Sequence, residues 1–122
     1  MNTISIIEHT DNPHLLHCQL QTPKGIYNIP LNHILFIECS QKKSFIHTNS
    51  EIFTLPLPLY RIKEVLPPHL FIQTHRSFLV NLNHISHIDK QTDPWTIFFF
   101  QSEKRAYISR NSRQVILKAV SD

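Results

Sequence analysis

The sequence predicts a mainly β domain: about ten short strands in small antiparallel sheets, with one or two short helices. Short runs rich in β-branched and aromatic residues recur along the 122 residues, as in strands. Polar or proline-containing stretches separate these runs at intervals that suit hairpin turns. Only one internal segment shows the apolar spacing of a helix.

Size and composition favour one globular domain. Hydrophobic residues make up 41% of the chain and charged residues 17%, which is typical of a folded protein. There is no run of about 18 apolar residues, so no membrane insertion is expected. Glu8 and Asp11 stand where a signal peptide would be apolar. We therefore expect a cytoplasmic protein in which Cys18 and Cys39 are buried thiols.

The N-terminal half predicts a series of short strands. The dense run Ile34–Cys39 indicates a central strand. The other expected strands are a short one at Ile4, Ile6 and Ile7 that ends at Pro13, the pair 14–21 and 26–30 around the turn 22–25, and the pair 44–47 and 52–55 around the turn 48–51.

One helix is expected between these strands and the next group. Leu59, Ile62, Val65 and Leu66 fall on one face, which predicts a helix from about Pro58 to Leu66. The pair Pro67-Pro68 would end it.

The C-terminal half predicts more strands and a closing helix. Segment 71–88 begins and ends as a strand, and segments 95–101 and 105–109 form a hairpin around 102–104. Phe98, Phe99 and Phe100 are interpreted as core, the alternative being a surface for a protein partner. Val115, Ile116 and Ala119 or Val120 predict a short helix capped by Ser109 or Asn111.

The distribution of charge favours a polyanionic partner. The net charge is +3 and the isoelectric point is about 9.0. No acidic residue occurs from Val65 to Ile88 or from Lys104 to Lys118. Such local basic surplus suits a nucleic acid. A basic surface that only aids solubility is the alternative.

Three polar interruptions, each following a predicted strand, could form a nucleic-acid surface. They are 40–44, 75–77 and 109–113, and each mixes a cation with hydroxyl or amide side chains. Arginine can read a guanine edge, asparagine suits adenine, and lysine and serine hold phosphate. The alternatives are three ordinary polar turns and, for Arg76, an ion pair with a carboxylate.

The motifs of catalysis and metal binding are missing from the sequence. Gly25 is the only glycine, so no glycine-rich phosphate loop exists. Ser77, His75 and Asp89 could form a triad on paper, but nothing marks an oxyanion hole. His84 and His87 would lie on opposite faces of a strand. His9, His14 and His17 have no accompanying ligand set, so we expect no enzyme, metal site or cofactor.

The order of these pieces resembles a known family, the LytTR domain. The pieces are the strand Ile34-Leu35-Phe36-Ile37-Glu38, the helix ending Leu66-Pro67-Pro68, the motif Phe71–Asn81 with Ile85 and Ile88, and the closing Tyr107-Ile108-Ser109-Arg110-Asn111. LytTR domains are the DNA-binding output modules of many bacterial response regulators. The resemblance extends from about Cys18 to Val120, so residues 1–17 are predicted to be an N-terminal extension and 18–122 the LytTR-like DNA-binding domain.

The resemblance implies a transcriptional regulator that reads the major groove of double-stranded promoter DNA through loops. It implies direct-repeat sites, a homodimer on DNA and a regulatory protein partner. The implied contact residues are Lys42, Lys43 and Ser44, then Arg76 and Ser77, then Arg110, Asn111 and Arg113, with His75 orienting its loop. No receiver domain fits before Cys18, so the chain is expected to be either a stand-alone regulator or a piece of a longer protein, and the initial methionine favours the first. The alternatives are a β-rich protein-interaction module without DNA binding and a metal or small-ligand sensor.

Overall fold

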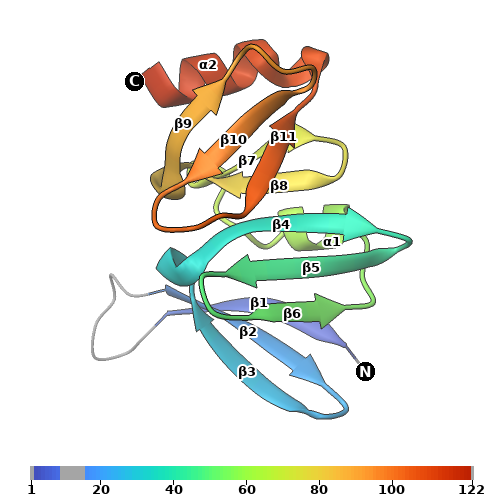
Figure 1. Ribbon diagram of the computed structural model, residues 1–122. Helices are drawn as coiled ribbons and strands as arrows, with labels where there is room; N and C mark the ends of the chain where they lie inside the picture. Colours follow the sequence, from blue (N-terminus) through green and yellow to red (C-terminus); the bar gives the residue numbers. More distant parts are fainter. Residues whose placement is uncertain (1, 9–15, 122) are drawn as a thin grey trace.

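The computed structural model describes residues 2–8 and 16–121 and confirms the mainly β fold (Figure 1). In these residues eleven strands form three antiparallel sheets. The strands are β1 (Thr3–Glu8), β2 (Leu16–Thr22), β3 (Gly25–Pro30), β4 (Ile34–Ser40), β5 (Lys43–Thr48), β6 (Ile52–Leu55), β7 (Phe71–His75), β8 (Phe78–Asn81), β9 (Ile85–Asp89), β10 (Trp95–Phe99) and β11 (Arg105–Ile108). The helices are α1 (Leu59–Lys63) and α2 (Arg113–Ser121), and 3-10 turns lie at η1 (Leu31–His33), η2 (Leu82–His84) and η3 (Arg110–Ser112).

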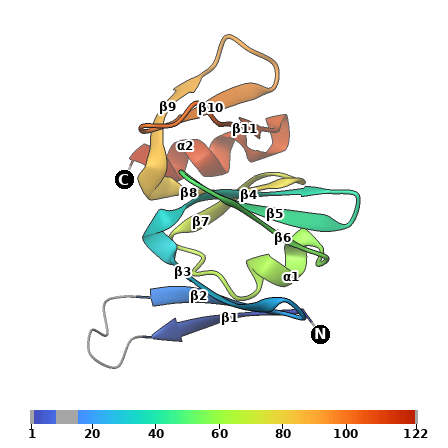
Figure 2. The same ribbon diagram turned by 60° about the horizontal axis from the view of Figure 1, so that its bottom comes forward.

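The sheets are stacked in three layers. The five-stranded sheet, of order β6-β5-β4-β8-β7, lies between the sheet β1-β2-β3 and the sheet β11-β10-β9 (Figure 2). One hydrophobic core, which includes α1, fills the space toward β1–β3, and a second core, which includes α2, fills the space toward β9–β11. β1 pairs along β2, and its Ile4 and Ile6 pack against the first core. This part of the predicted N-terminal extension therefore lies within a sheet, while the domain division at residue 18 stays a prediction.

β4 is the central strand of the middle sheet, as its apolar sequence predicts. Both of its faces are covered, so the strand needs an almost continuous run of apolar residues. Ile34 and Ile37 enter the first core, whereas Leu35 and Phe36 enter the second. An irregularity in the pairing of β4 with β5 between Ile34 and Phe36 accounts for two consecutive residues on one side.

A polar chain joins the middle sheet to the β10–β11 hairpin. His47 stacks on Phe36 with ring centroids 4.4 Å apart. Its Nε2 lies 2.7 Å from Glu38 Oε1, and the Lys104 ammonium donates to its Nδ1 at 3.2 Å and to the Thr48 carbonyl at 3.0 Å. A proton on Nε2 satisfies all three groups with a neutral imidazole. Burial lowers the pKa of His47, and the nearby Lys104 charge lowers it further.

Both predicted helices exist with changes. α1 ends at Lys63 and not at Leu66, because the last predicted turn loosens ahead of Pro67. Leu59, Ile62 and Leu66 are nevertheless buried as predicted.

In α2, Ile116 is fully buried and Ala119 is half-buried, whereas Val115 and Val120 are exposed, so the predicted apolar face is wrong at Val115 and includes Ala119 in place of Val120. A 3-10 turn, η3, precedes the helix, and Ser109 is its N-cap without a side-chain cap hydrogen bond. The helix packs on one side only, where Ile116 enters the second core.

The prediction that Phe98, Phe99 and Phe100 are all core is wrong for Phe100, which is 54% exposed. β10 ends at Phe99, and Gln101 takes a positive φ of 55°, so the chain already turns away from the core at Phe100. Phe99 is buried. Phe98 is half-buried between His87 and Arg105. The centroids of the Phe98 and His87 rings are 4.3 Å apart, and Arg105 Cζ lies 4.1 Å from the Phe98 centroid.

The remaining sequence expectations concern thiols, metals and membranes. Cys18 is fully buried, and burial raises its pKa to about 12, whereas Cys39 is only half-buried. Within residues 2–8 and 16–121, no group of three His, Cys, Asp or Glu side chains is placed to hold a metal ion. His9, Pro13 and His14 lie outside the described residues. None of the helices described is long and apolar enough to cross a membrane.

Candidate nucleic-acid interface

The three polar interruptions lie at one edge of the molecule, on the right-hand side of Figure 1. The first two are neighbours because β4 pairs with β8, and the Cys39 N–H donates to the Ser77 carbonyl at 2.9 Å. The third is tied to the second by the Ser109 N–H, which donates to the Thr74 carbonyl at 2.8 Å. The buried Thr74 hydroxyl also donates to the Tyr107 carbonyl at 2.8 Å. The β7–β8 turn is therefore the middle of the three.

The β4–β5 turn presents two lysines. Gln41 and Lys42 form a two-residue turn with φ values of 53° and 66°, the pattern of a type I′ hairpin. Lys42 and Lys43 are exposed, and neither side chain has a hydrogen bond or ion pair within the described part of the chain. Ser44 is placed differently. It is fully buried, and its hydroxyl donates to the Leu57 carbonyl at 2.7 Å, so it supports the turn from below.

The β7–β8 turn presents Arg76. The Ser77 N–H donates to His75 Nδ1 at 3.1 Å, and the His75 ring packs edge-on against Phe78, which is buried. These contacts hold the turn in one conformation. Arg76 is exposed, and across residues 2–8 and 16–121 it makes no hydrogen bond or ion pair. The carboxylate partner considered for Arg76 is thus not seen in the described chain.

An open groove of about 480 Å³ connects the middle turn with the start of α2. Its lining includes His75 and Arg76 from the β7–β8 hairpin, and Asn111 and Val115 from η3 and α2. Lys63, at the end of α1, also lines this groove and donates to Gln73 Oε1 at 2.8 Å. Sequence reasoning missed Lys63 because it was assigned only to the polar face of a helix. Its place just before the Pro-Pro stop and the arginine motif was the available signal.

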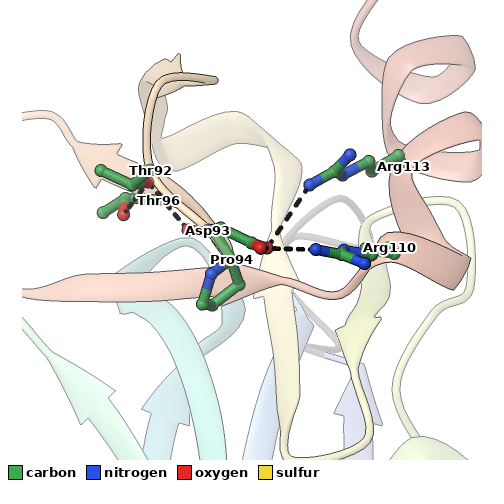
Figure 3. Close-up of polar contacts among 6 residues, drawn as sticks. All are labelled: Thr92, Asp93, Pro94, Thr96, Arg110 and Arg113. Carbon is green, nitrogen blue, oxygen red and sulfur yellow. Dashed lines mark hydrogen bonds and ion pairs between the residues drawn. The ribbon is translucent and has the colours of Figure 1, made fainter.

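The third segment is held by an acidic residue that sequence reasoning also missed. Asp93, in the β9–β10 loop, accepts from Arg110 Nη2 at 2.6 Å, and its other oxygen lies 3.7 Å from Arg113 Nη2 (Figure 3). The Arg110 side chain is still 75% exposed, and Asn111 beside it is exposed. Arg113 is only 29% exposed and stacks on Trp95, its Cζ 4.5 Å from the ring centroid.

The contact between Asp93 and Arg110 shifts the pKa of both groups. The Arg110 hydrogen bond and charge lower the pKa of Asp93, and the Asp93 carboxylate raises the pKa of Arg110. Both groups are therefore ionised at neutral pH. In the sequence, Asp93 reads as an ordinary turn residue before Pro94. Asp89 and Glu103 also lie between the two stretches that lack acids, so the local sequence does not distinguish Asp93.

Comparisons with known proteins identify the family of the chain. A family profile described as the LytTr DNA-binding domain matches residues 24–121. The chain is similar to a solved LytTr DNA-binding domain from Bacillus cereus, with 25% identity and a TM-score of 0.74, over 87% of this chain and 97% of that one.

Curated relatives are regulatory proteins. The chain is 38% identical over 66 residues, or 54% of its length, to the transcriptional regulatory protein YpdB of Escherichia coli K12. It is 32% identical over 78 residues, or 63% of its length, to the transcriptional regulatory protein NatR of Bacillus subtilis. The matches span only 25% of YpdB and 34% of NatR. The family profile accounts for most of the chain, and the chain belongs to the family of LytTR DNA-binding domains.

Proposed function

We propose that this domain regulates transcription by reading the major groove of promoter DNA through its three loops. The observation that carries the proposal is the common edge formed by the β4–β5 turn, the β7–β8 turn and the start of α2. Each loop continues a strand with buried side chains, so its cations are presented from a rigid base. The activity proposed is binding without catalysis.

The three loops are assigned different roles. Arg76 and Arg110 read base edges, where one bidentate contact discriminates by about 1–3 kcal/mol. Asn111 lies beside them for a further base contact. Lys42, Lys43 and Arg113 neutralise phosphates, with the smaller share from Arg113 because it is mostly covered. His75, Ser77 and Ser44 hold the loops in position.

The proposed setting is a bacterial cytoplasm, with the domain acting on direct repeats as a homodimer and answering to a regulatory protein partner. The relatives named as transcriptional regulators support this setting, and they are longer than this chain. The number of bound copies would follow from the stoichiometry on duplexes that carry one or two half-sites.

The test is selection of a best duplex from a randomised library, followed by titrations with Arg76→Ala. We expect weaker binding to the selected duplex and relaxed preference at one position, because the fork of N–H donors is lost. Arg61→Ala, at an exposed arginine on α1, removes the same charge and is the matched control. It should retain the preference at every position.

Equal binding by Arg76→Ala and the wild-type chain would overturn the base-reading role of Arg76. If the wild-type chain selected no sequence and bound no duplex in a saturable, salt-dependent manner, the protein-interaction alternative would replace DNA reading altogether.

A further inference from the structure

We infer that Asp93 is a positioning residue, which holds the Arg110 guanidinium in the orientation that reads a base and limits binding to DNA of any other sequence. The inference rests on the proposed function, since it assigns the source of selectivity at one of the three loops. Asp93 belongs to none of these loops. It lies in the β9–β10 loop and faces Arg110 and Arg113, which extend toward it from η3 and the start of α2 (Figure 3).

The Asp93 carboxylate is itself held in place. Its Oδ1 faces Arg113 Nη2 at 3.7 Å, and the Arg113 guanidinium lies over the Trp95 ring. Arg113 Nε is buried and has no hydrogen-bond partner among the residues described. The cation–π contact with Trp95 therefore does more than hydrogen bonds at Nε to hold this guanidinium in place. Trp95, Arg113, Asp93 and Arg110 thus form a continuous series from a packed ring to an exposed guanidinium.

The loop that carries Asp93 is closed by its own hydrogen bonds. The Thr92 hydroxyl lies 2.8 Å from the Pro94 carbonyl and 2.8 Å from the Thr96 hydroxyl. Thr96 is buried at the start of β10. The segment around Asp93 is therefore anchored to β10 through Thr96, and the carboxylate has a defined position.

The contact leaves Arg110 able to read a base. A guanidinium has five N–H donors. Nε and Nη2 form one fork of two parallel N–H groups, and Nη1 and Nη2 form a second fork with the other Nη2 hydrogen. Asp93 accepts from Nη2 alone, so one complete fork stays available for the two acceptors of a guanine. A free arginine at this position would sample many rotamers and could equally bind any nearby phosphate. The carboxylate removes that freedom without occupying the reading edge.

The charge of Asp93 adds discrimination against wrong sequences. It offsets one of the two positive charges of Arg110 and Arg113, so phosphate attraction at this loop is reduced for every duplex. A correct base recovers two hydrogen bonds from Arg110, and a wrong base recovers none. Selectivity at this position therefore depends on Asp93 although Asp93 itself need not touch DNA.

The test compares Asp93→Asn with wild type on two probes: the duplex selected from a randomised library and a scrambled duplex of the same composition. We expect tighter binding of Asp93→Asn to the scrambled duplex, and a loss of about fivefold or more in preference at the position that Arg110→Met identifies. Glu103→Gln, an equal charge change at the other end of β10, is the control and should keep the preference at every position. Asp93→Glu should restore part of it.

Each outcome decides the inference. In the Arg110→Met background, Asp93→Asn should have no further effect on preference, because Asp93 acts through Arg110. If Arg110→Met relaxes one position and Asp93→Asn relaxes none, the inference fails and the proposed function stands. If Arg110→Met changes no position, or the wild-type chain selects no duplex, the base-reading role of Arg110 fails and the inference fails with it. Asp93 and Arg110 are both exposed, so melting temperatures should stay close to wild type.

Discussion

Asn81 is a buried amide that connects distant parts of the chain. Its Nδ2 donates to the Ile34 carbonyl at 2.9 Å and approaches the Leu31 carbonyl at 3.4 Å, and its Oδ1 accepts from the Asn83 N–H at 3.0 Å. It therefore joins the end of β8 to the start of β4. These two paired strands carry the first two loops at their opposite ends.

We expect Asn81→Ala to lower the free energy of unfolding by about 2–3 kcal/mol, because buried backbone groups lose their partners. Urea denaturation followed by circular dichroism measures this change. Asn83→Ala is the control, since the exposed Asn83 contributes only its backbone N–H to the network. A similar small loss for both variants would contradict the role given to the Asn81 amide.

Single residues were the hardest part to predict. Arg76 and Arg110 look alike in the sequence, each an arginine among hydroxyl and amide residues. The structure distinguishes them, because Arg110 is bonded to Asp93, 17 positions away, whereas Arg76 has no such contact in the described chain. The burial of Ser44 also depends on a distant residue, because its hydroxyl donates to the carbonyl of Leu57, 13 positions further on. Contacts over such separations leave no local pattern to read.

The β4–β5 turn is an element in which stability and binding oppose each other. A positive φ costs most side chains about 1–2 kcal/mol, and Lys42 adopts one at 66°. Lys42 also offers an exposed charge to DNA. Lys42 thus combines backbone strain with a positive charge that the proposed DNA binding uses.

Replacing Lys42 by glycine should separate these effects. We expect Lys42→Gly to raise the free energy of unfolding by about 0.5–1 kcal/mol, because glycine takes this conformation without strain. The same change should lower the slope of log affinity against log salt by about 0.9, the share of one phosphate contact. Thermal melts and salt titrations of binding provide the two measurements. Lys24→Gly, in the β2–β3 turn of the N-terminal sheet, which carries none of the three loops, should leave the salt slope unchanged.

Elements with local signals were predicted well. The hairpins follow from turn residues between β-prone runs, and the central position of β4 follows from its apolar sequence. The end of α1 was missed because the turn ahead of Pro67 loosens, and the exposed face of α2 was missed because it depends on which side of the helix meets a sheet. The candidate site is predictable to the same extent. Each of its three loops can be recognised in the sequence, but Asp93 and Lys63 are brought to the site only by the fold.

Across the whole molecule, His47 connects the middle sheet to the C-terminal hairpin through Lys104. Its pKa in the folded chain is lowered from 6.5, so the unfolded chain binds the proton more readily. The stability that depends on neutral His47 is complete above about pH 6.5 and is lost as the pH falls through the folded pKa. Protonation would place an imidazolium against the Lys104 ammonium.

We therefore expect the free energy of unfolding to fall between pH 7 and pH 5, and to fall less steeply in His47→Gln. Denaturant titrations at a series of pH values measure the difference. His69→Gln, at an exposed histidine, should keep the wild-type slope. Identical slopes for His47→Gln and the wild-type chain would show that other groups set the acid sensitivity.

The position of β4 between two cores limits how this family member can vary in length. Ile34 and Ile37 point to one core, and Leu35 and Phe36 point to the other. Deleting one residue after the irregular pairing at Ile34–Phe36 would move every following side chain to the opposite face. Both cores would then receive the wrong residues at once, and the turn with Lys42 would rotate away from the β7–β8 turn. Natural insertions and deletions should accumulate in the β2–β3 connection and be excluded from β4.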